Sequence, residues 1–252
     1  IGRMKLLRGL VTVLAAMAAV FASPAWSMTV QPVVIDLSVS GRGMSQVITV
    51  ENTFATPLPV ELRVEELMFD ETGVKSTGKP SEDLLIFPPQ ALIQPGQTQT
   101  FRIQYVGDPD LKASKHYYVT VAQLPVKLPR GQSAIPILNN FQVLVSVSPA
   151  GAKPALAIRS AEIGKNAEGK PAPVLTLANP SAAHAYLSNG RLRIIQTDAS
   201  GKEVFRKTLS GPEIQQTIGF GLVGANQVRR MTLPIVLPTE GGKLDVSFTP
   251  ET

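Results

Sequence analysis

Residues 60–67 read V-E-L-R-V-E-E-L, and this stretch indicates the fold class. Val60, Leu62 and Val64 alternate with charged or polar neighbours, so one side of the segment is apolar and the other is charged. A period of two residues is typical of a strand with one buried face, whereas an amphipathic helix repeats every ~3.6 residues. We therefore predict a half-buried β-strand here.

The same alternation recurs along the chain after Met28. Further strands are predicted at 33–37, 46–50, 98–106, 117–124, 135–147, 155–162, 174–178, 187–196, 203–209, 228–236 and 243–248. Clusters of Gly, Pro, Asp and Ser separate them, as turns require. The one candidate for a short helix is 108–114. The pattern predicts an all-β protein.

A break reading P-A-G-A-K-P at residues 149–154 divides the strands into two groups of similar size. Six or seven short strands on each side fit two β-sandwich domains of immunoglobulin-like size. We expect a first domain at 28–149, a linker at 150–154 and a second domain at 155–252. A single large β-barrel is the alternative, but the position of the break favours two domains.

The first 27 residues have the pattern of a secretory signal peptide. A basic start with Arg3, Lys5 and Arg8 precedes an apolar run at 9–22 and the small residues of P-A-W-S at 24–27. The alternative is a membrane anchor, but the run is shorter than the ~20 apolar residues that span a bilayer. We expect an exported protein with no membrane insertion.

Composition excludes several kinds of chemistry. The 252 residues include no cysteine, which removes disulfides, thiol nucleophiles and cysteine-ligated metals, and the two histidines are too few for a three-histidine metal site. The net charge of +5 comes from 24 basic and 19 acidic residues, and three of the basic ones lie in the leader. The remaining charge does not predict a nucleic-acid partner. No cofactor or metal is expected.

One motif matches the sequence pattern of a dinucleotide-binding enzyme site. Residues 219–224 read G-F-G-L-V-G, which matches the G-x-G-x-x-G of dinucleotide-binding loops. That loop binds phosphates only between a strand and a helix, and here the motif precedes another predicted strand at 228–236. Asp108 and Asp110, beside a glycine and a proline, fit a turn better than a pair of catalytic carboxylates. The sequence therefore predicts a protein that is not an enzyme.

The predicted strand at 135–147 is longer than the ~5–6 residues of an average strand. Ile135, Ile137, Phe141 and Val143 share one parity, while the other parity is mixed. Its second half should belong to the core, and its first half could offer an apolar edge to a partner. The alternative is an ordinary long hairpin strand.

Several segments together resemble one family. They are Asn52, I-F-P-P at 86–89, P-G at 95–96 before F-R-I at 101–103, Tyr117 with Q-L-P at 123–125 before the long strand, N-P-S at 179–181, and G-L-V-G at 221–224 before Arg229. With the leader, they are similar to the periplasmic pilus-assembly chaperones of chaperone–usher systems, the PapD-like family. Each motif is loose, and together they cover the chain after the leader.

The resemblance implies two immunoglobulin-like domains in an L- or boomerang-shaped arrangement and a binding function in the periplasm. Such chaperones donate a strand to the incomplete fold of pilin subunits and deliver them to an outer-membrane usher. The donor residues would be Ile135, Ile137, Phe141 and Val143. An empty donor edge invites self-association of the free chain. The alternative function is a pilus subunit, an adhesin or another two-domain binding protein.

The loop before the donor strand carries Lys127 and Arg130, which the resemblance places near the subunit; solvated loop charges are the alternative. Better-known members hold the carboxylate end of the subunit with an arginine in the first strand and a lysine late in the donor strand. Here residues 33–37 contain no arginine, and Leu144 stands at the lysine position. The chain therefore resembles a divergent, archaic or alternative branch.

A carboxylate anchor in this chain would need another cation, and the bidentate guanidinium of arginine suits it. Arg102, which lies between Phe101 and Ile103 in a predicted strand, is the first candidate. Arg63 is the second. A solvent-facing strand arginine is the alternative for both.

Overall fold

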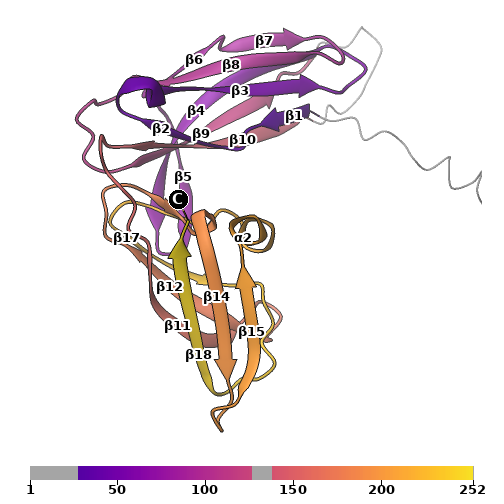
Figure 1. Cartoon of the computed structure of the whole chain (residues 1–252). Helices are drawn as coiled ribbons and strands as arrows, with labels where there is room; N and C mark the ends of the chain where they lie inside the picture. The colour runs from indigo at the N-terminus through magenta and orange to yellow at the C-terminus, as the bar shows by residue number, and fades with distance from the viewer. Residues whose placement is uncertain (1–27, 127–137, 252) are drawn as a thin grey trace, which may run out of the picture.

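The structure, a computed structural model, describes residues 28–126 and 138–251. The predicted leader at 1–27, the loop cations Lys127 and Arg130, and the predicted donor residues Ile135 and Ile137 lie outside the described residues. The described chain forms two β-sandwich domains, with the first lying across one end of the second in an L shape (Figure 1). The predicted fold class is therefore confirmed.

The first domain contains two sheets. One has the order β1-β3-β8-β6, and the other has the order β2-β10-β9-β4-β5, with β7 also paired to β4. The strands are β1 Met28–Gln31, β2 Val34–Ser38, β3 Ser45–Asn52, β4 Leu58–Asp70, β5 Gly73–Pro80, β6 Leu84–Phe87, β7 Gln90–Ile93, β8 Thr98–Tyr105, β9 Lys115–Gln123 and β10 Asn140–Ser148, and a 3-10 turn spans Gly41–Met44.

The alternation that predicted β4 points its apolar side into the first core. Val60 and Leu62 are buried, and Val64 packs against the same cluster. From the facing sheet, Phe101 and Ile103 of β8 enter the same space with no exposed surface. Burying a side chain of this size contributes ~1.5–3 kcal/mol, so the two sheets hold each other mainly through this core.

The second domain has its own core and three smaller sheets, with the orders β11-β12-β17, β13-β16 and β15-β14-β18. Its elements are β11 Ala157–Lys165, β12 Pro171–Asn179, β13 Ala185–Tyr186, a 3-10 turn Leu187–Asn189, β14 Gly190–Thr197, β15 Glu203–Leu209, α2 Gly211–Thr217, β16 Leu222–Val223, β17 Gln227–Thr232 and β18 Lys243–Pro250. The core includes Leu175, Leu177, Leu192 and Ile194, each without exposed surface.

A short helix, α2, lies at residues where the sequence pattern predicts none. In α2, a capping box joins Ser210 to Glu213, with the Ser210 N–H donating to the Glu213 carboxylate over 2.7 Å. Residues 108–114, the predicted helix candidate, form turns instead. None of the helices within residues 28–126 and 138–251 is long and apolar enough to cross a membrane.

The structure also settles the surroundings of the glycine motif. Residues 219–224 leave the C-terminal end of α2 and enter the two-residue strand β16. A dinucleotide loop needs the reverse order, with a strand leading into the positive N-terminal end of a helix. The motif therefore forms the turn after α2 together with the short strand β16.

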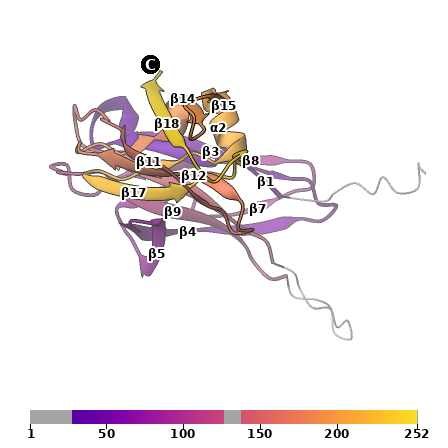
Figure 2. The ribbon, with the colours of Figure 1, turned by 90° about the horizontal axis from the view of Figure 1, so that it is seen from below.

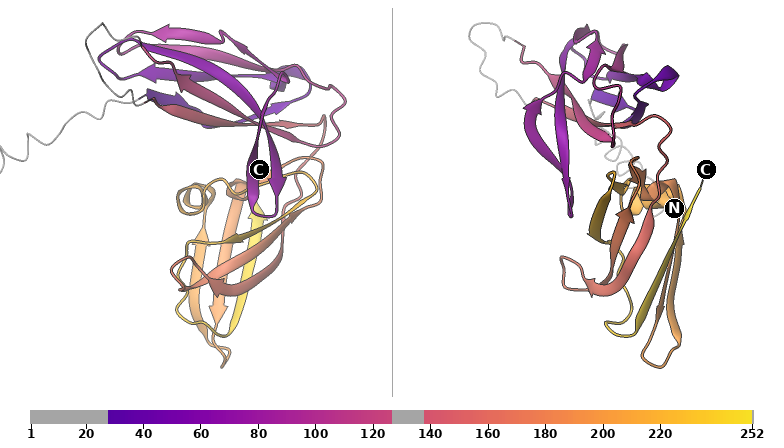
Figure 3. Two further views of the ribbon diagram at one scale, coloured as in Figure 1. Left: turned by 180° about the vertical axis from the view of Figure 1, so that it is seen from behind. Right: turned by 90° about the vertical axis from the view of Figure 1, so that its left-hand side faces the viewer.

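A hairpin of the first domain extends toward the second. β4 pairs with β9 on one side and with β5 on the other, and the far end of the β4–β5 hairpin leaves the sandwich (Figures 2 and 3). Beside its turn, the backbone N–H of Arg230 in β17 donates to the carbonyl of Glu71 over 3.0 Å. The hairpin therefore forms a second link between the domains in addition to the covalent linker.

Candidate functional site

Strand β10 has one edge that is only partly covered. It pairs antiparallel with β9 from Asn140 to Val147, but parallel with β2 only from Leu144 to Ser148. The last bond on the β2 side joins the Leu144 N–H to the Val33 carbonyl over 3.0 Å. Within the described part of the chain, residues 140–143 therefore face no strand on that side.

The backbone direction follows from these bonds. In a strand, the N–H and C=O of one residue point to the same side, and the side alternates from residue to residue. Because Leu144 faces β2, Gln142 and Asn140 face the same side, where β2 has not yet begun. Each of these two residues offers a donor and an acceptor to an added strand.

Two of the predicted donor residues, Phe141 and Val143, lie on the side of β10 that faces the core of the first domain. Val143 has no exposed surface and belongs to the core of the first domain, and Phe141 packs partly against the same core. The opposite parity faces outward, with Asn140 and Gln142 exposed, Leu144 half-buried and, just before the strand, Leu138 at 42% exposure. Phe141 and Val143 are apolar because they pack into the core of their own domain.

The two predicted anchor arginines lie apart from each other and from the space between the domains. Arg63 projects from β4 and is 65% exposed, with its guanidinium on Glu61 of the same strand over 2.7 Å. Arg102 is exposed on β8, and its Nε donates to the hydroxyl of Ser45 over 2.8 Å. Neither lines the cleft between the domains.

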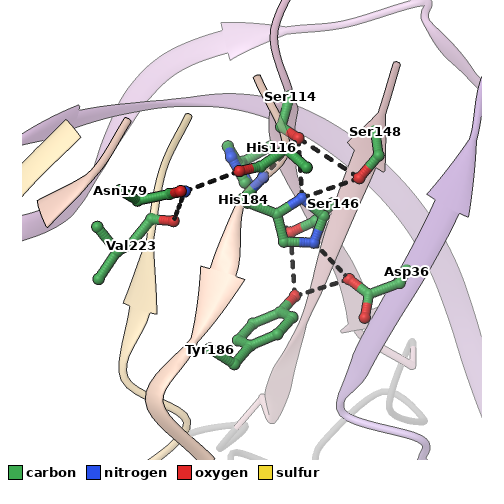
Figure 4. A network of polar contacts seen from close by, with 10 residues as sticks. Asp36, Ser114, His116, Ser146, Ser148, Asn179, His184, Tyr186 and Val223 are labelled. Atoms are coloured by element: carbon green, nitrogen blue, oxygen red, sulfur yellow. Dashed lines mark hydrogen bonds and ion pairs between the residues drawn. The ribbon is translucent and has the colours of Figure 1, made fainter. Parts of the chain in front are cut away.

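A polar network fills the junction between the domains (Figure 4). The Tyr186 hydroxyl, from β13 of the second domain, donates to Oδ1 of Asp36 in β2 over 2.8 Å. Nε2 of His184 lies 2.8 Å from the same oxygen. One carboxylate oxygen of the first domain therefore holds two side chains of the second.

The other nitrogen of His184 is held by serines of the first domain. Its Nδ1 lies 2.9 Å from the Ser114 hydroxyl and 3.2 Å from the Ser148 hydroxyl, while its backbone N–H donates to Ser114 over 2.9 Å. These hydroxyls can donate to Nδ1 while Nε2–H donates to Asp36. Both ring nitrogens of His184 therefore have partners, and its side chain is only 5% exposed.

His116 lies behind this network. Its Nδ1 is 2.8 Å from the Ser146 hydroxyl, which also lies 3.2 Å from the Tyr186 hydroxyl. Its Nε2 is buried and has no hydrogen-bond partner among the described residues. Burial, with a smaller effect from His184, lowers the pKa of His116 from 6.5 to about 3. In contrast, burial and the charge of Asp36 raise the pKa of Tyr186.

Two buried asparagines brace the loops of the two domains. Nδ2 of Asn52 donates to the carbonyls of Ile93 and Thr56, each over 2.9 Å. Nδ2 of Asn179 donates to the carbonyls of Ala183 and Gly224 over 2.7 and 3.0 Å. These residues, noted in the sequence as part of the resemblance, have a structural role, and Asn179 fixes the segment that carries His184.

The turn of the β4–β5 hairpin yields a prediction about stability. Gly73 has a φ of +129°, and an added Cβ would lie 3.1 Å from Nη2 of Arg229. Nη1 of Arg229 is held by the Leu222 carbonyl over 2.7 Å, so the guanidinium has little freedom to move. We expect Gly73→Ala to lower the free energy of unfolding by ~1–3 kcal/mol, measured by urea denaturation.

The matched control for that variant is Gly78→Ala in the same strand. Gly78 also has a positive φ, +67°, but nothing lies within 4 Å of an added Cβ. We expect a smaller loss there, because only the backbone cost remains. Equal losses in both variants would show that the contact with Arg229 contributes nothing.

Comparison with known proteins places the chain in a family. The model of the PapD N-terminal domain, described as that of pili and flagellar-assembly chaperones, matches residues 27–153. The chain belongs to this family of pilus-assembly chaperones. The comparison with curated protein sequences gave no match.

Solved structures share the fold of this chaperone at low sequence identity. The YadV chaperone matches with a TM-score of 0.52 and 14% identity, over 88% of this chain and 91% of that one. The archaic CsuC–CsuE chaperone–tip subunit complex of Acinetobacter baumannii matches with a TM-score of 0.50 and 14% identity, over 88% and 97%. The SafB chaperone with the SafA pilin of Salmonella enterica gives 0.50 and 14%, over 91% and 98%. These likenesses concern the fold.

Proposed function

We propose that the chain is a periplasmic chaperone that captures pilin subunits by lending them β10 and delivers them to an outer-membrane usher. Family membership supports the chaperone role. The solved structures of SafB with a pilin and of CsuC with a tip subunit support the same class of partner.

The observation that carries the proposal is the uncovered edge of β10 at residues 140–143. A sandwich that lacks one strand leaves backbone groups unpaired, and an added strand satisfies them. β10 is suited to this because β9 pairs with its other edge. In addition, Val143 and Val145 are buried in the core of the first domain. The donor is therefore rigid before the partner arrives, which lowers the entropy cost of binding.

The side chains on the outward face of β10 would contact the subunit. Leu138 and Leu144 are its apolar positions, with Asn140 and Gln142 between them. A subunit that fits this face would offer apolar pockets near the two ends and polar partners in the middle. Ile135 and Ile137 stay predicted donor residues, and Lys127 and Arg130 stay predicted loop contacts.

The test is co-expression of the full chain with the small β-rich subunit encoded beside it, followed by purification from the periplasm. We expect a stoichiometric complex in which the subunit is soluble only when the chain is present. A subunit that folds equally well alone would contradict the chaperone proposal. Recovery of the chain itself in a fibre would favour the alternative of a pilus subunit.

A further inference from the structure

The junction between the domains contains a small cavity of about 240 Å³. Asp36, His184 and Tyr186 form its polar side, and Leu156, Phe248 and Pro250 are among its apolar lining. Pockets for small molecules usually measure ~300–1,000 Å³. This cavity is smaller, so a single side chain fits it better than a cofactor or a metabolite.

The charge of the cavity is set by one carboxylate. Asp36 is 53% exposed, and its Oδ1 accepts hydrogen bonds from Tyr186 and His184. Both partners belong to the second domain, so they fix the direction of the carboxylate. Among the described residues, Oδ2 has no hydrogen-bond partner and no lysine or arginine pairs with Asp36 or lines the cavity.

These features select the charge of a ligand. A carboxylate entering the cavity would meet Asp36 with no cation to offset the repulsion. An ammonium or guanidinium group could instead donate to the free Oδ2 in a charge-assisted hydrogen bond. The apolar wall suits the aliphatic stem of such a side chain, which packs while its charged end stays hydrated.

The position of the cavity relative to β10 identifies the occupant. β2 begins where the uncovered edge of β10 ends, and Asp36 pairs with Ser146, two residues or ~7 Å beyond Leu144. A chain paired to residues 140–143 would be collinear with β2, and the end of that chain nearest β2 would lie close to Asp36.

We infer that this cavity holds a lysine or arginine side chain of the captured subunit, with Asp36 as its counter-ion. The inference rests on the proposed function, because it takes the occupant from a subunit bound at β10. It departs from the carboxylate anchor that the sequence suggested for Arg102 or Arg63, both of which lie elsewhere.

The experiment is an NMR titration of the ¹⁵N-labelled free chain with n-butylammonium and, separately, with butyrate. We expect butylammonium to shift the backbone amides of His184, Ala185 and Tyr186 saturably, and butyrate to leave them unchanged. Asp36→Asn keeps the size of the side chain and should weaken butylammonium binding at least tenfold, ~1.4 kcal/mol. Asp245→Asn, which removes the same charge from an exposed position on β18, should leave it unchanged.

Butyrate binding that depends on His184, or butylammonium binding that ignores Asp36, would overturn the inference. The titration contains no subunit, so its failure leaves capture by β10 standing. If butylammonium binds but the chain captures no subunit, the cation site stands. The proposed function and the assignment of the occupant to a subunit would then both be wrong. In the complex, Asp36→Asn should weaken subunit capture about tenfold, and an unchanged affinity would contradict the role of Asp36.

Discussion

Replacing Gln142 by proline is expected to prevent subunit capture while the chain still folds. The Gln142 N–H points to the uncovered side of β10, as the bond from Leu144 to Val33 establishes. Proline removes this donor and places its ring where a partner strand would approach. An unpaired buried carbonyl on the partner costs ~1–3 kcal/mol, so capture should weaken ~10- to 100-fold or more.

The fold should survive because the β9 side of the ladder uses other residues. Phe141 and Val143 face β9, and proline is tolerated in strands where its missing N–H would point to solvent. The measurement is the affinity for the co-expressed subunit, together with a urea midpoint for the free variant. Gln142→Ala is the matched control, because it shortens the same side chain and keeps the N–H.

A folded Gln142→Pro variant that captures subunits with unchanged affinity would show that the edge at 140–143 is not the pairing site. A loss in Gln142→Ala equal to that in the proline variant would assign the effect to the side chain. The two variants therefore separate backbone pairing from side-chain recognition along the same strand.

The strands that could be predicted are those with one buried face. β4 and β8 alternate between apolar and polar residues because one side of each packs on a core. β5, which reads G-V-K-S-T-G-K-P, was missed because it is held at the sheet edge by β4 and buries little beyond its first residue. The α2 helix was missed although its capping box was readable at 210–213.

Strand β10 shows that periodicity alone does not identify a binding face. Phe141 and Val143 stand out in the sequence because they are apolar, and they are apolar because they fill the first core. The opposite face of β10, with Asn140 and Gln142, is mixed and gives a weak signal. Alternation identifies which residues share a face, but it does not tell whether that face turns inward or outward.

The interdomain network could not be predicted for a different reason. Asp36 lies 148 residues from His184 and 150 from Tyr186, and no local pattern links positions so far apart. Composition alone drew attention to the histidines of this network, because the chain has only two. Both lie at the junction, with their rings 5.2 Å apart.

His116 is expected to make stability depend on pH. Its pKa is about 3 in the folded chain and near 6.5 when unfolded, so the unfolded state binds more protons between these values. The free energy of unfolding is therefore highest above pH ~6.5 and falls by up to ~1.4 kcal/mol per pH unit as the pH drops toward 3. Between pH 7 and pH 5.5, His116 alone should remove ~1.3 kcal/mol.

His116→Phe isolates this contribution. Phenylalanine fills the space of the ring beside Phe69, whose ring lies 4.5 Å away, and removes the buried Nε2 that has no partner among the described residues. Ser146 keeps the Tyr186 hydroxyl, 3.2 Å away, as a hydrogen-bond partner. We expect the variant to have a stability within ~1 kcal/mol of the wild type at pH 7 and to lose less on acidification.

The measurement is urea denaturation of the wild type and of His116→Phe at pH 7 and at pH 5.5. His184, which faces His116 and contacts Asp36, is present in both proteins, so the difference between their pH slopes reports His116. Equal slopes would mean that His116 takes up a proton as readily in the folded chain as in the unfolded one between pH 7 and pH 5.5. Because Ser146 joins His116 to Tyr186, and Tyr186 joins the second domain to Asp36, that result would place a charge directly behind the link between the domains.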